Sequence, residues 1–326
     1  MEDQNSFQIR TELSGLQESV NNIKNEAKKI IIGQDNVIDL LIAAVIADGH
    51  VLIEGVPGVA KTLIAKILAK TISSGFSRIQ FTPDLMPSDI IGTSVFNMRK
   101  SEFEFSRGPI FSNIILIDEI NRAPAKTQAA LFEVMEERQI SVDGTTYLMS
   151  EPFIVFATQN PIEHEGTYRL PEAELDRFLF KVEIDYPTLE QETKILLDLH
   201  DRKNVNDLSQ IQPVLTPDKL SAYRDKVRKI HIDDNIAKYI AKIISSSRNN
   251  KDLYLGGSPR ASLSVLSGAK AAAAMKGRDF ITPDDVKEVV FPALRHRILL
   301  TPEKEMEGST TEEIIKNIID KIEVPR

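Results

Sequence analysis

Short apolar runs alternate with amphipathic segments between residues 50 and 185. The run at 114–117 (Ile-Ile-Leu-Ile) contains no polar residue, as expected of a strand that is buried on both faces. Because strands that alternate with helices favour parallel pairing, this region predicts a mainly parallel sheet with helices on both faces. The predicted strands span residues 50–54, 78–82, 114–117, 153–157 and 180–184.

Helices are predicted where apolar residues recur every three or four positions. Residues 12–31 and 34–47 follow this pattern and make a helical N-terminal segment, 1–48, that precedes the first strand. Between strands, residues 61–71 and 125–138 follow it too.

Two inserts, near residues 93–110 and 139–149, interrupt the alternation. The second is a predicted β-hairpin, because Asp143-Gly144 separates two alternating segments and a tight hairpin turn needs positive φ. The first contains aromatic residues that we expect to form its core, namely Phe96, Phe103 and Phe105.

The character of the sequence changes after Pro187, where no further apolar strand pattern is clear. Several of the remaining segments begin with a capping residue followed by proline, as at Thr282-Pro283. We therefore predict an α/β domain at residues 1–187 and an all-α domain at 188–326. The helices predicted in the second domain span residues 189–199, 217–229, 234–247, 259–276, 283–294 and 311–322.

Composition narrows the class of protein. No apolar stretch reaches the ~20 residues of a membrane span, and the acidic start of the chain lacks the features of a signal peptide. The chain has no cysteine, and its histidines show no ligand spacing, so no protein-ligated metal is assigned. A cytoplasmic location is expected. The net charge of −8 argues against a general attraction to nucleic acid or anionic membrane.

The strongest chemical signal is the segment Gly-Val-Pro-Gly-Val-Ala-Lys-Thr at residues 55–62, between a predicted strand and a predicted helix. Backbone N–H groups in such a turn, with a helix N-terminus behind them, can wrap a polyphosphate. Lys61 would reach the β and γ phosphates, and the Thr62 hydroxyl would ligate Mg²⁺. Ala60 replaces the usual second glycine, and Gly58 lies two residues earlier. The alternative is an ordinary strand–turn–helix junction.

Polar side chains also follow two predicted buried strands. Asp118 and Glu119 come directly after the strand at 114–117, which places them at the carboxyl edge of the sheet, beside the phosphate loop. There Asp118 would hold Mg²⁺ through water and Glu119 would polarise the attacking water. Asn160 follows the next strand and would position that water; its alternative is an Asn-Pro turn.

Two arginines are candidates for contacts to phosphate. Arg177 would stabilise transition-state charge from a neighbouring subunit, although an isolated arginine there is more often a surface ion-pair partner. Arg260 begins a helix of the second domain and would contact the γ-phosphate; its alternative is a solvated residue at a helix start.

Together these elements resemble the AAA+ ATPases and, within them, the MoxR-like family, over nearly the whole chain. The fold that this implies is a P-loop NTPase core followed by a helical lid. The blocks that carry the resemblance are residues 32–34, 55–62, 81–89, 108–111, 118–124, 128–131, 135–137, 157–161, 170–173 and 258–261.

The resemblance implies a role for each candidate. Asn160 takes the sensor 1 role, Arg177 the arginine-finger role and Arg260 the sensor 2 role, with Arg122 and Arg169 as competing fingers. The two inserts would face the pore of a ring or a partner. Implied catalytic residues are Lys61, Asp118, Glu119, Asn160, Arg177 and Arg260, and the Mg²⁺ contacts are Thr62 and Asp118. Implied nucleotide-binding residues are Ile32, Gly33, Gln34, Gly55, Val56, Pro57, Gly58, Val59, Ala60, Lys61, Thr62 and Leu63.

The implied function is an ATP-driven ring, expected to be a hexamer, that uses ATP and Mg²⁺ and acts as a chaperone-like remodeller. Its expected client, a protein with a von Willebrand factor A domain, would be matured or loaded with a cofactor or metal. Two alternatives stay open. One is a nucleotide-dependent switch with little turnover. The other is a DNA-acting motor, against which the acidic charge and the lack of a DNA-binding module argue.

Overall fold

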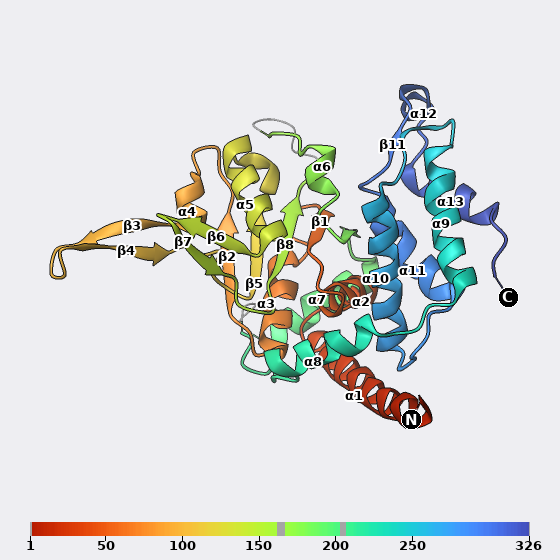
Figure 1. The fold of residues 1–326 in the computed structure, drawn as a ribbon, viewed down its shortest axis with the longest axis horizontal. Coiled ribbons are helices and arrows are strands. Elements are labelled where there is room, and N and C mark those ends of the chain that lie inside the picture. The colour runs from red at the N-terminus through yellow and green to blue at the C-terminus, as the bar shows by residue number, and fades with distance from the viewer. Residues whose placement is uncertain (1, 162–166, 203–206, 326) are drawn as a thin grey trace.

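The computed structural model describes residues 2–161, 167–202 and 207–325. Its centre is a five-stranded parallel sheet with the strand order β2-β5-β8-β1-β9 (Figure 1). The predicted parallel sheet is confirmed, with strand ends shifted by at most two residues. The strands are β1 (Val51–Gly55), β2 (Phe76–Gln80), β5 (Ile114–Asp118), β8 (Ile154–Gln159) and β9 (Phe180–Ile184).

Successive residues of each strand enter two different cores, because side chains alternate across a sheet. Val51 and Ile53 lie in the larger core with residues of α1 (Glu2–Lys28), α2 (Asp35–Ile46) and α3 (Lys61–Thr71). Leu52 lies in the smaller core, with residues of α5 (Ala125–Glu137). The sheet therefore has helices on both faces, as the sequence predicts.

Two β-hairpins leave the body of the α/β domain. The predicted hairpin consists of β6 (Gln139–Val142) and β7 (Thr145–Leu148), and its turn has positive φ at Asp143 and Gly144. The first insert is also a hairpin, made of β3 (Gly92–Asn97) and β4 (Glu102–Arg107), which projects far from the sheet (Figure 1). Shorter elements of this domain are α4 (Pro87–Ile91), the 3-10 helix η1 (Ile120–Arg122) and α6 (Glu172–Leu175).

The expectation that the aromatic residues form a core in the first insert is wrong for two of them. Phe96 and Phe103 contact each other edge to face, but they are 48% and 72% exposed. A two-stranded arm has no second layer to cover its face, so its aromatic side chains stay in solvent. Phe105 instead stacks near Tyr147 of the second hairpin, at 4.6 Å between ring centroids.

The part of the chain after Pro187 is helical, with one exception. A short antiparallel pair, β10 (Leu253–Leu255) and β11 (Leu299–Leu300), joins two loops, so the expectation of no further strand is wrong at this point. Neither piece is long enough to give an alternating pattern. The helices are α7 (Leu189–Arg202), α8 (Pro217–Arg228), α9 (Asp234–Arg248), α10 (Pro259–Met275), α11 (Pro283–Leu294), α12 (Pro302–Met306) and α13 (Thr311–Asp320).

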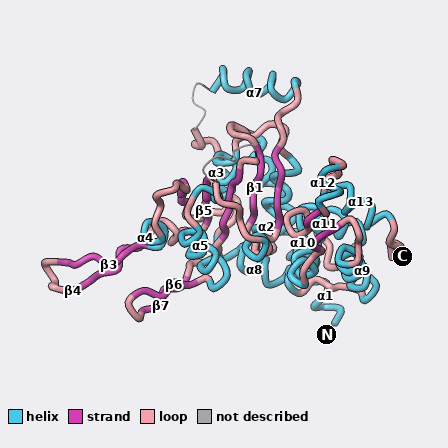
Figure 2. Tube along the Cα trace, turned by 90° about the horizontal axis from the view of Figure 1, so that it is seen from above, coloured by secondary structure: helices cyan, strands magenta, loops and turns pink. Residues whose placement is uncertain are grey.

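These helices do not lie together as one layer. α10 packs against both α1 and α2, and α11 packs against β9, whereas α7 stands apart from α9–α13 (Figure 2). Pro187 lies between β9 and α7, and the domain boundary predicted there stays a prediction. None of the described helices combines the length and apolarity that crossing a bilayer requires.

Candidate functional site

The phosphate loop joins the carboxyl end of β1 to the first turn of α3. Gly58 and Ala60 both have positive φ, at 89° and 62°. This left-handed backbone costs a residue with a Cβ roughly 1–2 kcal/mol, so Ala60 adopts the conformation that a glycine at this position would take without strain. Lys61 Nζ donates to the carbonyl oxygen of Gly55 at 2.7 Å, which folds the side chain back over the loop.

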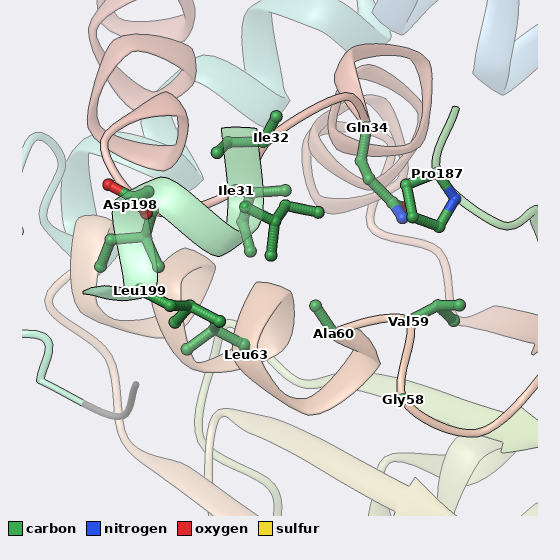
Figure 3. Close-up of a pocket in the computed structure, with 12 residues that line it drawn as sticks. Ile31, Ile32, Gln34, Gly58, Val59, Ala60, Leu63, Pro187, Asp198 and Leu199 are labelled. Carbon is green, nitrogen blue, oxygen red and sulfur yellow. The ribbon is translucent and has the colours of Figure 1, made fainter. Parts of the chain in front are cut away.

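A cavity of about 200 Å³ opens between the phosphate loop, the segment that precedes α2, and α7 (Figure 3). Most of its walls are aliphatic. The side-chain oxygen Oε1 of Gln34, which lines it, is buried and has no hydrogen-bond partner. Apolar walls with a few polar groups and an open acceptor fit the base of a nucleotide. The lining residues are Ile30, Ile31, Ile32, Gln34, Gly58, Val59, Ala60, Leu63, Pro187, Ile195, Asp198 and Leu199.

Asp118 ends β5 and is buried, with 8% of its surface exposed. Thr158 Oγ1 donates to its Oδ1 at 3.2 Å, and Arg78 Nε donates to its Oδ2 at 2.5 Å. Both partners come from the strands that flank β5. The Asp118 carboxylate lies at the carboxyl edge of the sheet, where β1 leads into the phosphate loop and Thr62. A carboxylate and a hydroxyl at this edge are oxygen donors that fit Mg²⁺ held together with a phosphate.

Glu119 follows directly and has a left-handed backbone, with φ 58°. Its N–H donates to Thr158 Oγ1 at 3.1 Å, so one hydroxyl connects the backbone of Glu119 to the carboxylate of Asp118. Its Oε2 accepts from Gln80 Nε2 at 2.8 Å and from Arg122 at 3.0 Å. Strained backbone of this kind is concentrated at functional sites, and here the carboxylate direction is set by residues of the same chain.

Asn160 follows β8 and is buried, with 7% exposed. The register pairs Gln80 with Asp118 and Glu54 with Gln159, so these strands end at one edge of the sheet. The structure therefore brings the phosphate loop, the two carboxylates and Asn160 to the same edge, as the sequence predicts.

Arg177 and Arg260 lie together at a different place. Arg177 donates to the carbonyl oxygen of Phe132 at 2.7 Å and lies 3.7 Å from the carboxylate of Glu136. Arg260, in the first turn of α10, donates to the other oxygen of Glu136. Glu136 is thus shared by an arginine of the α/β domain and an arginine of the helical domain.

This shared glutamate lies at the amino edge of the sheet. Its neighbour Met135 accepts from the ring of His50, which precedes β1, and Leu179, which precedes β9, donates to His50. The phosphate loop follows the other end of β1, and a five-residue strand is about 16 Å long. The structure therefore does not bring Arg177 or Arg260 to the phosphate loop of their own chain.

The two competing arginine candidates have different surroundings. Arg122 is held at Glu119 of its own chain, as described above. Arg169 pairs with Glu172 at 3.1 Å and has a side chain that is 78% exposed.

Four of the residues described above were not among the sequence candidates: Arg78, Gln80, Glu136 and Thr158. Arg78 and Gln80 lie in an alternating strand beside the strand that carries Asp118. The position of their strand next to that of Asp118 is the signal that could have identified them as site residues. Nothing in the local pattern distinguishes Glu136 from the other glutamates of its helix, since its partners come from 41 and 124 residues further along the chain.

Two family models match this chain. The family described as "ATPase family associated with various cellular activities (AAA)" matches residues 50–180, and the AAA lid domain matches residues 245–318. YeaC of Bacillus subtilis is 43% identical over 297 residues, which cover 91% of this chain and 92% of YeaC. Chaperone MoxR1 of Mycobacterium tuberculosis is 41% identical over 310 residues, which cover 92% of this chain and 81% of MoxR1.

A solved structure is similar along the entire chain. The crystal structure of a protein from Cytophaga hutchinsonii superposes with a TM-score of 0.90 at 39% identity and covers 100% of both chains.

Proposed function

Because this chain belongs to the MoxR-like family of AAA+ ATPases, we propose that it binds ATP with Mg²⁺ and hydrolyses it. The observation that carries the proposal is the meeting of the phosphate loop, Asp118, Glu119 and Asn160 at one edge of the sheet. The base would occupy the aliphatic cavity under α7, and the phosphates would follow the loop at residues 55–62.

Each group at this edge has a task in hydrolysis. Lys61 would leave the carbonyl oxygen of Gly55 to contact the β and γ phosphates, and Thr62 and Asp118 are the residues that would hold Mg²⁺. Bound there, Mg²⁺ would neutralise charge on the phosphate oxygens. Glu119 accepts a proton from the attacking water, and Asn160 orients that water. Glu119 must first exchange its hydrogen bonds to Gln80 and Arg122 for one to water.

We assign the arginine finger to Arg177 and place Arg260 beside it, both acting on the nucleotide of a neighbouring subunit. Their position at the amino edge of the sheet, with Glu136 between them, supports this assignment. Arg122 is occupied at Glu119 of its own chain, which argues against it as the finger. Membership of the family implies an oligomeric assembly, and a hexameric ring is proposed.

The ring would act in the cytoplasm as a chaperone-like remodeller that matures a client or loads it with a cofactor or metal, the client being a protein with a von Willebrand factor A domain. The arm β3–β4 supplies a surface suited to such a client. The arm itself projects away from the body of the chain (Figure 1). Four of its apolar side chains are exposed. They are Val95, Phe96, Met98 and Phe103.

The test of the proposal is steady-state phosphate release by the assembled protein and by its Glu119→Gln variant. The variant keeps the shape of the side chain but is a poor proton acceptor, so turnover should fall by about 10²–10⁴-fold. Binding of a fluorescent ATP analogue should persist. Glu133→Gln, an exposed change on α5, serves as the matched control and should keep full turnover. If the intact protein releases no phosphate in any assembled state, the proposal fails.

A nucleotide-dependent switch with little turnover is the second candidate. It is favoured by the two hydrogen bonds that hold Glu119 in this conformation. Tight ATP binding by the assembled ring, with phosphate release no faster than that of Glu119→Gln, would support the switch over the ATPase.

A further inference from the structure

We propose that Asp176 is a positioning residue that holds Arg177 and Arg260 as one unit, so that both arginines meet the nucleotide of the neighbouring subunit together. The inference rests on the proposed function, in which these two arginines act on the neighbour. In this inference Asp176 contacts neither the nucleotide of its own subunit nor that of the neighbour. Its role is to connect the α/β domain to the helical lid.

The carboxylate of Asp176 makes all its described contacts with the lid. Its Oδ1 accepts from Arg297 Nε at 2.6 Å, and its Oδ2 accepts from Ser258 Oγ at 2.8 Å. Its backbone carbonyl accepts from a second nitrogen of Arg297 at 2.9 Å. One residue between α6 and β9 thus binds two separate lid segments, at the start of α10 and after the end of α11.

Arg297 is the buried half of this connection, with 2% of its side chain exposed. It also donates to the backbone carbonyls of Phe178, Leu179 and Ala293. Asp176 is the carboxylate that pairs with this guanidinium, and removing one partner of a buried pair leaves the other charge uncompensated. Replacing Asp176 should therefore move the Arg297 segment rather than leave it in place.

Asp176 and Ser258, which bond to each other, each lie one or two residues from a candidate arginine. Arg177 directly follows Asp176, and Arg260 follows the capping residue Ser258 by two positions. Since consecutive Cα atoms are 3.8 Å apart, a shift of Asp176 or Ser258 is passed almost fully to the arginine beside it. The spacing of the two arginines is set by the bond from Ser258 to Asp176.

The charged side chains around Asp176 and Glu136 form a cluster that is suited to binding a phosphate group. Three guanidinium groups, those of Arg177, Arg260 and Arg297, meet two carboxylates, those of Glu136 and Asp176. Asp176 pairs with the buried Arg297, whereas Glu136 is shared by Arg177 and Arg260, and Glu174 also acts electrostatically on Arg177. A phosphate group from the neighbour can share Arg177 and Arg260 with Glu136, while Asp176 stays paired with Arg297.

The first test compares Asp176→Asn with the wild-type protein in the assembled state. The amide keeps the shape of the side chain but removes the charge that pairs with Arg297. Misplacing catalytic groups by about 1 Å can cost ~10² in rate, so kcat should fall by about that factor. The KM for ATP should stay within about twofold, because the substitution does not alter the phosphate loop or the aliphatic cavity that would bind the nucleotide. Asp225→Asn, an exposed change on α8, should leave both constants unchanged.

Ser258→Ala is a milder substitution. It keeps the proposal testable if Asp176→Asn fails to fold. It removes the hydrogen bond to Oδ2 and the N-cap hydrogen bond from the N–H of Ala261, and it should lower kcat severalfold, again without a change in KM. If both variants fold, assemble and turn over ATP at the wild-type rate, the proposal is overturned.

Mixed rings provide a readout that a purely structural role would not give. Asp176→Asn subunits keep an intact Glu119, while Glu119→Gln subunits keep intact arginines. When the two are mixed before assembly, an Asp176→Asn site beside a Glu119→Gln neighbour is complete, so phosphate release should exceed the sum of the two separate preparations.

The parallel mixture of Arg177→Ala with Glu119→Gln separates the two proposals. If it regains turnover while the Asp176→Asn mixture does not, the role of Asp176 is wrong and the action of Arg177 on its neighbour stands. If neither mixture regains turnover, the proposed action of the arginines across the interface fails, and the role of Asp176 fails with it.

Discussion

Arg78 and Asp118 form an ion pair across the neighbouring strands β2 and β5, with Arg78 Nε 2.5 Å from Asp118 Oδ2. The other oxygen of Asp118 accepts from Thr158. Both oxygens of the carboxylate assigned to Mg²⁺ therefore have protein partners in this conformation. The guanidinium is a positive group on an exposed side chain, so it competes with a cation for the same oxygen.

Arg78→Ala should consequently lower the Mg²⁺ concentration required for half-maximal binding of ATP. The Arg78 side chain is about half exposed, so solvent screens this ion pair to about 0–1 kcal/mol, and the shift should be no more than about fivefold. The measurement is a Mg²⁺ titration at fixed concentration of a fluorescent ATP analogue. Arg78→Lys keeps the charge and should shift the midpoint less. A higher Mg²⁺ requirement in Arg78→Ala would contradict the competition.

Gln80 should restrain turnover, because its amide donates to the Glu119 oxygen that would accept the proton. Replacing Gln80 with Leu removes the donor and keeps a similar side-chain volume. We expect the basal kcat of the assembled protein to rise severalfold with an unchanged KM. Steady-state phosphate release checks this, and a fall in kcat would show instead that Gln80 helps to orient Glu119 for catalysis.

His50 is buried between α5 and β8. Its Nε2 lies 3.2 Å from the carbonyl oxygen of Met135, and its Nδ1 accepts from the N–H of Val155 at 3.0 Å. One ring nitrogen donates and the other accepts, so this position requires the neutral ring. Burial, together with the positive charge of Arg138, lowers the pKa of His50 from 6.5 to about 4.

Stability should therefore depend on pH through His50. The unfolded chain takes up a proton near pH 6.5, whereas the folded chain does so only near pH 4. The contribution of the neutral His50 ring to the free energy of unfolding is fully present above pH 6.5. It is lost as the pH falls to about 4, and the total loss is about 3 kcal/mol. Urea unfolding measured at several pH values in this window checks it. His50→Gln can make both hydrogen bonds without titrating and should flatten the dependence; an unchanged slope would exclude His50 as its source.

Asp285 should be a main source of stability in the lid. Its carboxylate is fully buried, accepts from Arg278 and Lys276, and caps α11 through the N–H of Thr282. Breaking a buried ion pair by removing one partner costs about 3–5 kcal/mol, so Asp285→Ala should unfold at markedly lower denaturant concentration. Asp284→Ala is the control, because that neighbouring side chain is 88% exposed and should change stability little.

The sequence predicted the elements that depend on neighbouring residues. The all-apolar run that became β5, the helix at 61–71 and the turn at Asp143-Gly144 each follow from local periodicity or from a local need for positive φ. The arm β3–β4 was not recognised as a hairpin, because its turn lacks an Asn-Gly or Asp-Gly signal and its aromatic residues suggested a core.

The sequence by itself determined one edge of the site, since parallel strands that end in a phosphate loop, Asp118-Glu119 and Asn160 must place those groups together. Only the tertiary structure decided where the arginines lie. Arg260 is 83 residues beyond Arg177, and the two meet at Glu136 because Arg297 and Ser258 attach the lid to Asp176. A local pattern records which residues face one core, but it carries no information about which distant buried charges pair.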